Sequence, residues 1–104
     1  MADERRGEDR VPLLMDVRWE GLSGKYAARI SDISLSGCYV ESMGQVTVGE
    51  VIRFEIQLPT ARWMPLRGEV VYHLPTLGFG VKFTALTTME RNLLAHVIDY
   101  ARGS

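Results

Sequence analysis

The chain has 104 residues, of which 46% are hydrophobic and 24% are charged, and its formal net charge is −1. A chain of this length forms one domain around a single modest core, and the near-neutral charge excludes a general nucleic-acid binder, which would carry a basic surface. No apolar run reaches membrane-spanning length, the N-terminus is charged unlike a signal peptide, and the single cysteine cannot form an internal disulfide, so a cytoplasmic setting is expected.

Residues 1–10 precede the first strand pattern and are predicted to form a flexible arm carrying Arg5, Arg6 and Arg10. Guanidinium groups bind phosphates bidentately and stack on flat bases. Acidic residues are interleaved with these arginines, so the arm is unsuited to long DNA or RNA, which is bound by summed phosphate neutralisation. The arm is therefore either a grip for a small phosphate ligand or a solvated terminus with loosely paired charges.

Alternating apolar residues predict two strands joined as a hairpin, with a turn from Gly21 to Gly24. The expected core-facing residues are Val11, Leu13, Met15, Val17 and Trp19 on the first strand, and Tyr26, Ala28 and Ile30 on the second.

The segment from Asp32 to Gly37 is predicted to be a tight turn that carries a carboxylate, a hydroxyl and a glycine. A carboxylate accepts hydrogen bonds, and on such a turn it can take them from the edge of a guanine base. The same residues also suit a purely architectural turn, in which Asp32 accepts a backbone N–H and Gly37 supplies a positive φ.

Four further strands follow with the same period of two. Their expected core-facing residues are Cys38 and Val40, then Ile52, Phe54, Ile56 and Leu58, then Leu66, Val70, Tyr72 and Leu74, and finally Phe79, Val81 and Phe83. Trp63 is placed in or near a loop, either as an exposed partner contact or as a half-buried anchor. Six short strands in a small domain predict a closed or nearly closed antiparallel barrel, because closure removes unpaired edges.

The period changes near the C-terminus, where a helix is predicted over about 87–102. Thr87 and Glu90 have capping-box spacing, and Arg102-Gly103 suits a helix end. The helix carries an apolar stripe of Met89, Leu93, Val97 and Ala101, flanked by Leu94 and Ile98. The predicted fold class is all-β with one helix: a single domain over 11–104, a six-stranded antiparallel β-barrel whose C-terminal α-helix covers the barrel or one of its ends.

Three motifs in register resemble the PilZ domain family, whose members bind the bacterial second messenger cyclic di-GMP. The first is Arg6-Gly7-Glu8-Asp9-Arg10, two arginines separated by three residues ahead of the first strand. The second is Asp32-Ile33-Ser34-Leu35-Ser36-Gly37, which matches the family's Asp or Asn, any residue, Ser, two residues and Gly. The third is Gly78-Phe79-Gly80-Val81-Lys82-Phe83, which is similar to the family's last-strand signature. The resemblance covers nearly the whole chain and implies the barrel and helix already expected.

The resemblance implies cyclic di-GMP contacts for Arg5, Arg6, Arg10, Asp32, Ser34 and Gly37. Arg6 and Arg10 would clamp the phosphates and stack on or bond to the guanines. Asp32 would accept from the guanine ring N–H and amino group, a pattern that adenine cannot offer. Arginine at the position of Arg5 is associated in this family with an intercalated ligand dimer. Ser34 would donate to a ligand oxygen or fix the turn, and Gly37 would allow close backbone approach.

Two further ligand positions are implied by the resemblance. Tyr72 lies about where the family often has an aromatic residue against a base, although its parity with Val70 indicates core packing instead. The second position is Gly80, which belongs to the last-strand signature.

The resemblance implies a stand-alone receptor that folds its arm onto the barrel when cyclic di-GMP binds and relays the signal to a partner protein. The alternative is a PilZ-fold adaptor that acts by protein contact without nucleotide, although such members usually lack the arginines or the Asp-Ser-Gly pattern. No enzyme and no cofactor are expected, because the chain offers no catalytic constellation. His73, His96 and Cys38 are too scattered for a metal site.

Overall fold

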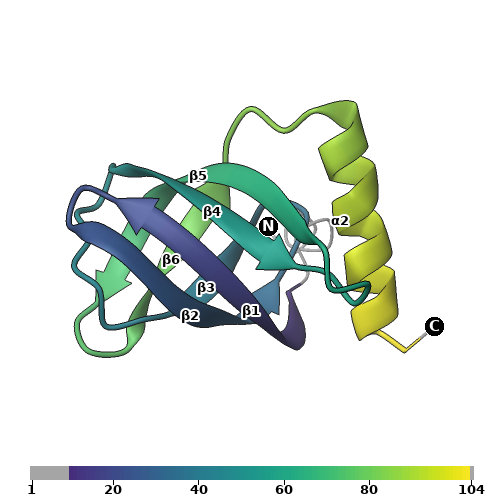
Figure 1. Ribbon diagram of the computed structural model, residues 1–104, viewed down its shortest axis with the longest axis horizontal. Helices are drawn as coiled ribbons and strands as arrows, with labels where there is room; N and C mark the ends of the chain where they lie inside the picture. The colour runs from purple at the N-terminus through teal and green to yellow at the C-terminus, as the bar shows by residue number, and fades with distance from the viewer. Residues whose placement is uncertain (1–9, 104) are drawn as a thin grey trace, which may run out of the picture.

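The computed structural model describes residues 10–103 and shows a β-barrel with a helix at its C-terminal end (Figure 1). The strands are β1 (Val11–Gly21), β2 (Gly24–Ile33), β3 (Gly37–Glu41), β4 (Val51–Gln57), β5 (Trp63–Leu74) and β6 (Gly78–Phe83), and the helix is α2 (Thr88–Ala101). For the described residues, the predicted all-β class, the six strands and the C-terminal helix are confirmed.

The six strands form a closed antiparallel barrel in the order β1-β2-β3-β6-β5-β4. β1 closes the barrel by pairing with β2 on one side and with β4 on the other. The predicted hairpin of β1 and β2 is confirmed, with Gly21 opposite Gly24. Because every strand of this barrel has two neighbours, its surface for binding consists of outward side chains and loops rather than a free strand edge.

The interior of the barrel is filled by the apolar half of the alternating pattern. Trp19, Phe79 and Ile30 are among its largest fully buried side chains. The Trp19 ring stacks on Tyr26 at 4.5 Å between centroids and meets Phe79 edge-on at 5.0 Å. Burial of one such side chain contributes roughly 1.5–3 kcal/mol to folding. A small-molecule site is therefore to be sought on the outside of the barrel.

α2 begins at the predicted capping box. The Glu90 N–H donates to Thr87 Oγ1 at 3.1 Å, and the Thr87 N–H donates to Glu90 Oε1 at 3.0 Å. The helix ends at Arg102, which is followed by Gly103 with a φ of 79°. Figure 1 shows α2 lying across one end of the barrel, as expected for a helix with one apolar face.

The buried face of α2 differs from the predicted stripe. The buried residues are Leu94, Val97 and Ile98, whereas Met89 is 72% and Leu93 is 36% exposed. The line that packs on the barrel passes through Leu94 rather than Leu93. Apolar spacing alone could not decide between these adjacent lines, because both carry aliphatic residues at helical intervals.

Trp63 lies at the first position of β5, next to the loop that precedes this strand rather than within it. It is opposite Gln57 of β4, and its side chain is half-buried, as the anchor alternative required. β5 therefore starts before Leu66, the first residue of the expected fifth strand. The sequence pattern missed this start because of Pro65, since proline usually marks an edge strand or a loop. In this barrel Pro65 lies within β5 opposite Glu55 and faces outward.

Candidate functional site

Arg10, directly before β1, and Asp32, near the end of β2, meet at the barrel surface. The strands are antiparallel with Val11 opposite Ile33, so the residue before β1 lies beside the end of β2. Arg10 Nη1 donates to Asp32 Oδ1 at 2.6 Å. The side chains are 42% and 32% exposed, which leaves the pair accessible to a ligand. The fold thus brings an arginine of the first motif to the aspartate of the second.

Asp32 lies on β2 and not in the turn predicted for it. It pairs with Pro12 on β1 and with Tyr39 on β3. The register shifts between Ile30 and Asp32, after which Ile33 is again fully buried, so the strand runs on past Asp32. A position between two neighbouring strands restrains the backbone of Asp32 from both sides and so fixes where its carboxylate emerges.

Ser34 holds the connection between β2 and β3 from inside. It is 1% exposed, and its Oγ accepts from the Gly37 N–H and the Ser36 N–H, each at 3.2 Å. The Ser34 N–H also donates to the Gly37 carbonyl oxygen at 2.8 Å. Of the two roles implied for Ser34, this geometry supports fixing the turn, because the hydroxyl is buried and already engaged.

Gly37 is needed for close packing of two strands and not for a positive φ. The glycines of residues 10–103 with positive φ are Gly24, Gly49, Gly78 and Gly103, so the expectation for Gly37 is wrong. A Cβ at Gly37 would overlap the backbone carbonyl oxygen of Val81 on β6. Glycine therefore allows β3 to lie against β6 where the second motif ends.

Tyr72 lies on the outer surface, contrary to the expectation that it packs in the core. It is 41% exposed, and Leu74 is 44% exposed. The register of β5 on β6 shifts between Val70 and Tyr72, and such an irregularity reverses which residues face inward. The parity shared with Val70 was therefore misleading, because it assumed an unbroken strand.

Tyr39 lies in a row that the sequence reasoning did not assign to the site. In this row Asp32 is opposite Tyr39, Tyr39 is opposite Gly80, and Gly80 is opposite Tyr72. The Tyr39 and Tyr72 ring centroids are 6.1 Å apart and the rings are inclined by 23°. Burial raises the pKa of the Tyr39 hydroxyl, and the nearby Tyr72, Glu41 and Asp32 raise it further. Its outward parity directly after the second motif was the signal that could have found it.

Cys38 lies beneath the ion pair and is fully buried. Burial raises the pKa of its thiol to about 12, while Arg10 lowers it and Asp32 raises it by smaller amounts. The thiol is therefore protonated at neutral pH and behaves as a core group, as the sequence predicted.

Arg5, Arg6 and the rest of the predicted arm up to residue 9 lie outside the described residues. Their roles stay predictions. Across residues 10–103, no group of three or more His, Cys, Asp and Glu side chains could hold a metal ion. Over that same span, no helix is both long enough and apolar enough to cross a membrane.

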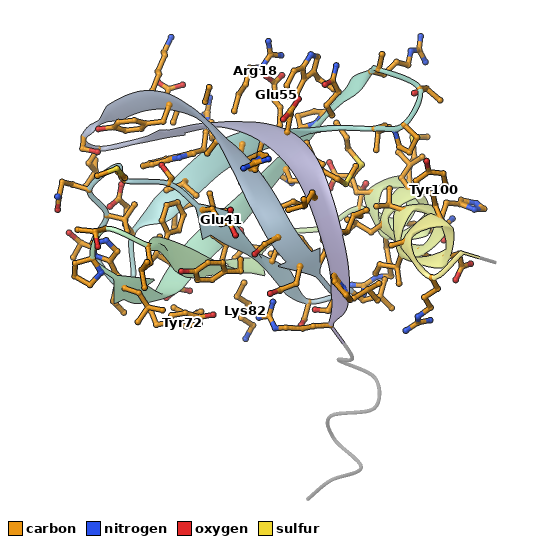
Figure 2. All side chains as sticks on the ribbon, turned by 90° about the horizontal axis from the view of Figure 1, so that it is seen from below. Arg18, Glu41, Glu55, Tyr72, Lys82 and Tyr100 are labelled. Carbon is orange, nitrogen blue, oxygen red and sulfur yellow. The ribbon has the colours of Figure 1, made fainter. Side chains whose placement is uncertain are left out.

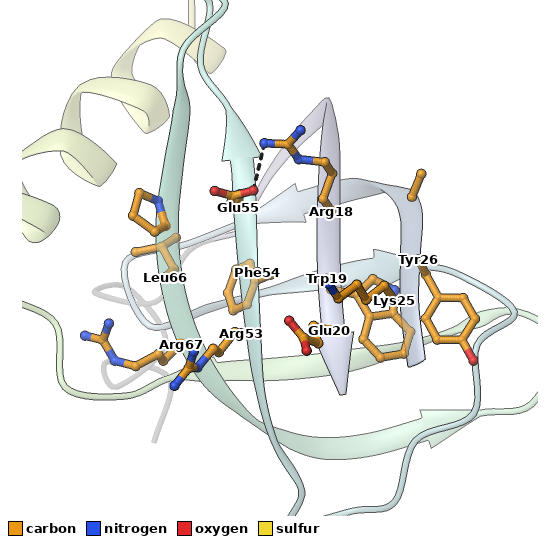
Figure 3. Close-up of a pocket in the computed structure, with 12 residues that line it drawn as sticks. Arg18, Trp19, Glu20, Lys25, Tyr26, Arg53, Phe54, Glu55, Leu66 and Arg67 are labelled. Atoms are coloured by element: carbon orange, nitrogen blue, oxygen red, sulfur yellow. Dashed lines mark hydrogen bonds and ion pairs between the residues drawn. The ribbon is translucent and has the colours of Figure 1, made fainter. Parts of the chain in front are cut away.

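A hollow of about 750 Å³ lies elsewhere on the barrel, over β1, β2, β4 and β5 (Figure 3). Arg18, which lines it, donates to Glu55 at 2.8 Å and lies 3.8 Å from the centre of the Trp63 ring. None of the predicted ligand residues lines this hollow. The candidate site is instead at Arg10 and Asp32, where the motif residues meet.

A family model described as PilZ domain matches residues 4–100. Three solved structures share the fold. The PilZ domain of YcgR from Escherichia coli with c-di-GMP is 12% identical with a TM-score of 0.78, covering 95% of this chain and 92% of that one. Bacillus subtilis Inhibitor of motility (MotI/DgrA) is 18% identical with a TM-score of 0.76, and 94% of this chain spans 51% of that one.

The third structure is the Borreliella burgdorferi PlzA protein in complex with c-di-GMP. It is 14% identical with a TM-score of 0.60, and 94% of this chain spans 37% of that one. The chain therefore spans about half the length of MotI and less of PlzA. A search of the curated proteins finds no match.

Proposed function

The chain belongs to the PilZ domain family, and from that premise we propose that it is a receptor for cyclic di-GMP. The observation that carries the proposal is the contact between Arg10 and Asp32, which joins the two motif segments on an accessible face. Two structures with the same fold, those of YcgR and PlzA, hold c-di-GMP.

The chemistry of the pair suits a guanine nucleotide. A guanidinium binds either a phosphate or the O6 and N7 acceptors of guanine, and the latter contact is worth roughly 1–3 kcal/mol of base discrimination. The carboxylate of Asp32 accepts from the guanine ring N–H and amino group. The contact between Arg10 and Asp32 involves one nitrogen and one oxygen, so each group retains further hydrogen-bonding capacity for the ligand.

The proposal extends to the arm and to the output. Arg5 and Arg6 would complete the grip on the phosphates, with two intercalated ligand molecules per site. Ordering of residues 1–10 on the barrel would change the surface offered to a downstream partner protein. The protein would act in the cytoplasm as a receptor and not as an enzyme, and cyclic di-GMP would be its ligand rather than a cofactor.

Isothermal titration calorimetry of the full chain with cyclic di-GMP tests this proposal. We expect binding in the micromolar range or tighter, with the stoichiometry giving the number of ligand molecules per site. Chromatography of the ligand after long incubation should recover it unchanged. Absence of binding by the intact, folded protein would refute the receptor function.

The second candidate function is an adaptor that acts by protein contact without nucleotide. The observation that favours it is the hollow lined by Arg18, which contains none of the predicted ligand residues. The Arg18 guanidinium also lies over the ring of the half-buried Trp63. The two functions are separated by the same titration, because an adaptor would give no heat with cyclic di-GMP.

A further inference from the structure

The outward face of β6 is built to seat two tyrosine rings. A Cβ at Gly80 would overlap the Tyr72 ring atoms Cε2 and Cζ. A Cβ at Gly78 would overlap the Val40 carbonyl oxygen first, and it would also lie 2.9 Å from the Tyr39 hydroxyl oxygen and 3.1 Å from Cζ. The two glycines of the last-strand signature therefore leave the space that the rings occupy. A larger residue at Gly80 would therefore displace the Tyr72 ring from the strand.

The two rings are nearly parallel and lie close together. Their planes differ by 23° and their centroids are 6.1 Å apart. A base inserted between two parallel rings would need about 3.5 Å on each of its faces, which is more than the 6.1 Å between the centroids allows. A base can therefore stack only on the outer side of the rings, where Tyr72 is 41% exposed.

This aromatic surface continues directly from the ion pair. Asp32 is the register partner of Tyr39, and neighbouring strands lie about 4.8 Å apart, so the carboxylate and the first ring are adjacent. Lys82, exposed on the same strand as Gly80, adds a cation to this side of the barrel. Figure 2 shows Tyr72 and Lys82 along one face. This face thus offers charged groups beside two aromatic rings, the combination that binds nucleotides.

We propose that Tyr39 is a ligand-contacting residue whose ring, together with that of Tyr72, stacks against a purine base of the nucleotide. This inference rests on the proposed cyclic di-GMP site and adds a residue that none of the three motifs contains. Stacking accepts any base, because every base has a π-face. Tyr39 therefore contributes affinity for purines, while Asp32 distinguishes guanine from adenine.

Titration of the full chain with cyclic di-GMP tests the role of the ring. Tyr39→Leu should weaken binding by about 5- to 150-fold, the range found for loss of one base–aromatic stack. Tyr39→Phe should bind within about twofold of the unchanged protein, since the ring alone supplies the stacking surface. Tyr100→Leu, at an exposed tyrosine of α2, is the matched control and should have no effect.

The outcomes separate this inference from the proposed function. If the unchanged protein fails to bind, the receptor function is refuted and the inference with it. If the unchanged protein binds and Tyr39→Leu binds equally well, only the inference is refuted. Equal losses in Tyr39→Leu and Tyr39→Phe would also refute it, because the hydroxyl and not the ring would then be responsible.

A measurement on the unsubstituted chain covers the case in which Tyr39→Leu does not fold. The chain contains four tyrosines, and 3-fluorotyrosine labelling gives each a separate ¹⁹F NMR signal. Addition of cyclic di-GMP should shift the signals of Tyr39 and Tyr72 and leave those of Tyr26 and Tyr100 unchanged. A shift of Tyr72 without Tyr39 would refute the proposal.

Discussion

Arg10 Nη1 lies 2.6 Å from Asp32 Oδ1, although 22 residues separate the two in the chain. A second ion pair of the barrel, Arg18 with Glu55, has an N···O distance of 2.8 Å and similar exposure, but it lies between β1 and β4. Solvent-exposed pairs of this kind contribute about 0–1 kcal/mol to stability. Both pairs are therefore minor terms in folding, which makes one a control for the other in binding.

Replacement of Arg10 by alanine should weaken cyclic di-GMP binding at least about fivefold, because one charge-assisted contact is worth roughly 1–3 kcal/mol. Calorimetric titration measures the change. Arg18→Ala is the matched control and should retain the affinity of the unchanged protein. Equal weakening by the two substitutions would mean that the overall charge of the protein, and not the Arg10 contact, governs binding.

Replacement of Asp32 by leucine should change which nucleotide is preferred. Leucine is similar in size to aspartate but has no acceptor oxygen, so the guanine ring N–H and amino group lose their partner. The preference for cyclic di-GMP over cyclic di-AMP should fall by about 5- to 150-fold. Parallel titrations with both ligands measure this ratio. An unchanged ratio would show that Asp32 does not contact the base.

Replacement of Ser34 by alanine should destabilise the fold. The buried Gly37 N–H loses the acceptor that it has at 3.2 Å, and such a loss costs about 1–3 kcal/mol. Urea unfolding measures the difference. Ser23→Ala is the control, because the Ser23 hydroxyl is exposed and water can replace it, at a cost of about 0.5 kcal/mol or less. Equal effects of the two substitutions would contradict a special role for Ser34.

Most of the fold could be predicted because period-two burial holds over most of the length of the strands. Residues such as Val17, Trp19, Ile52 and Phe54 face inward as the alternation requires. The start of α2 could also be predicted, because the capping box of Thr87 and Glu90 is a local sequence signal. Local patterns fail where tertiary contacts decide which residues are buried, as on α2, where Leu94 and not Leu93 faces the barrel.

The candidate site was less accessible to sequence reasoning. A bulge after Val70 turns Tyr72 outward, and a single sequence gives no sign of where a strand shifts register. The pairing of Tyr39 with Gly80 depends on β3 lying beside β6, which are distant in the chain. A shared site for Arg10 and Asp32 was expected only from the family resemblance, because each motif alone suits an ordinary terminus or turn.

The buried thiol of Cys38 should make stability fall with pH in the alkaline range. The ordinary pKa of a cysteine thiol is 9.0, and in the folded protein the pKa of Cys38 is raised to about 12, mainly by burial. Between these values the unfolded chain releases the thiol proton and the folded chain keeps it. The free energy of unfolding should therefore decrease as the pH rises above about 9, by up to about 1.4 kcal/mol per pH unit.

Urea unfolding of the unchanged protein and of Cys38→Ala, at pH values from about 7 to 11, isolates this effect. The substitution also removes packing atoms, but that loss is the same at every pH and shifts the stability curve without changing its slope. The two curves should be parallel below about pH 9, where the thiol is protonated in both the folded and the unfolded chain. Above it they should converge, because only the cysteine protein loses stability through the thiol. Curves that stay parallel to the highest pH would contradict a buried, proton-retaining Cys38.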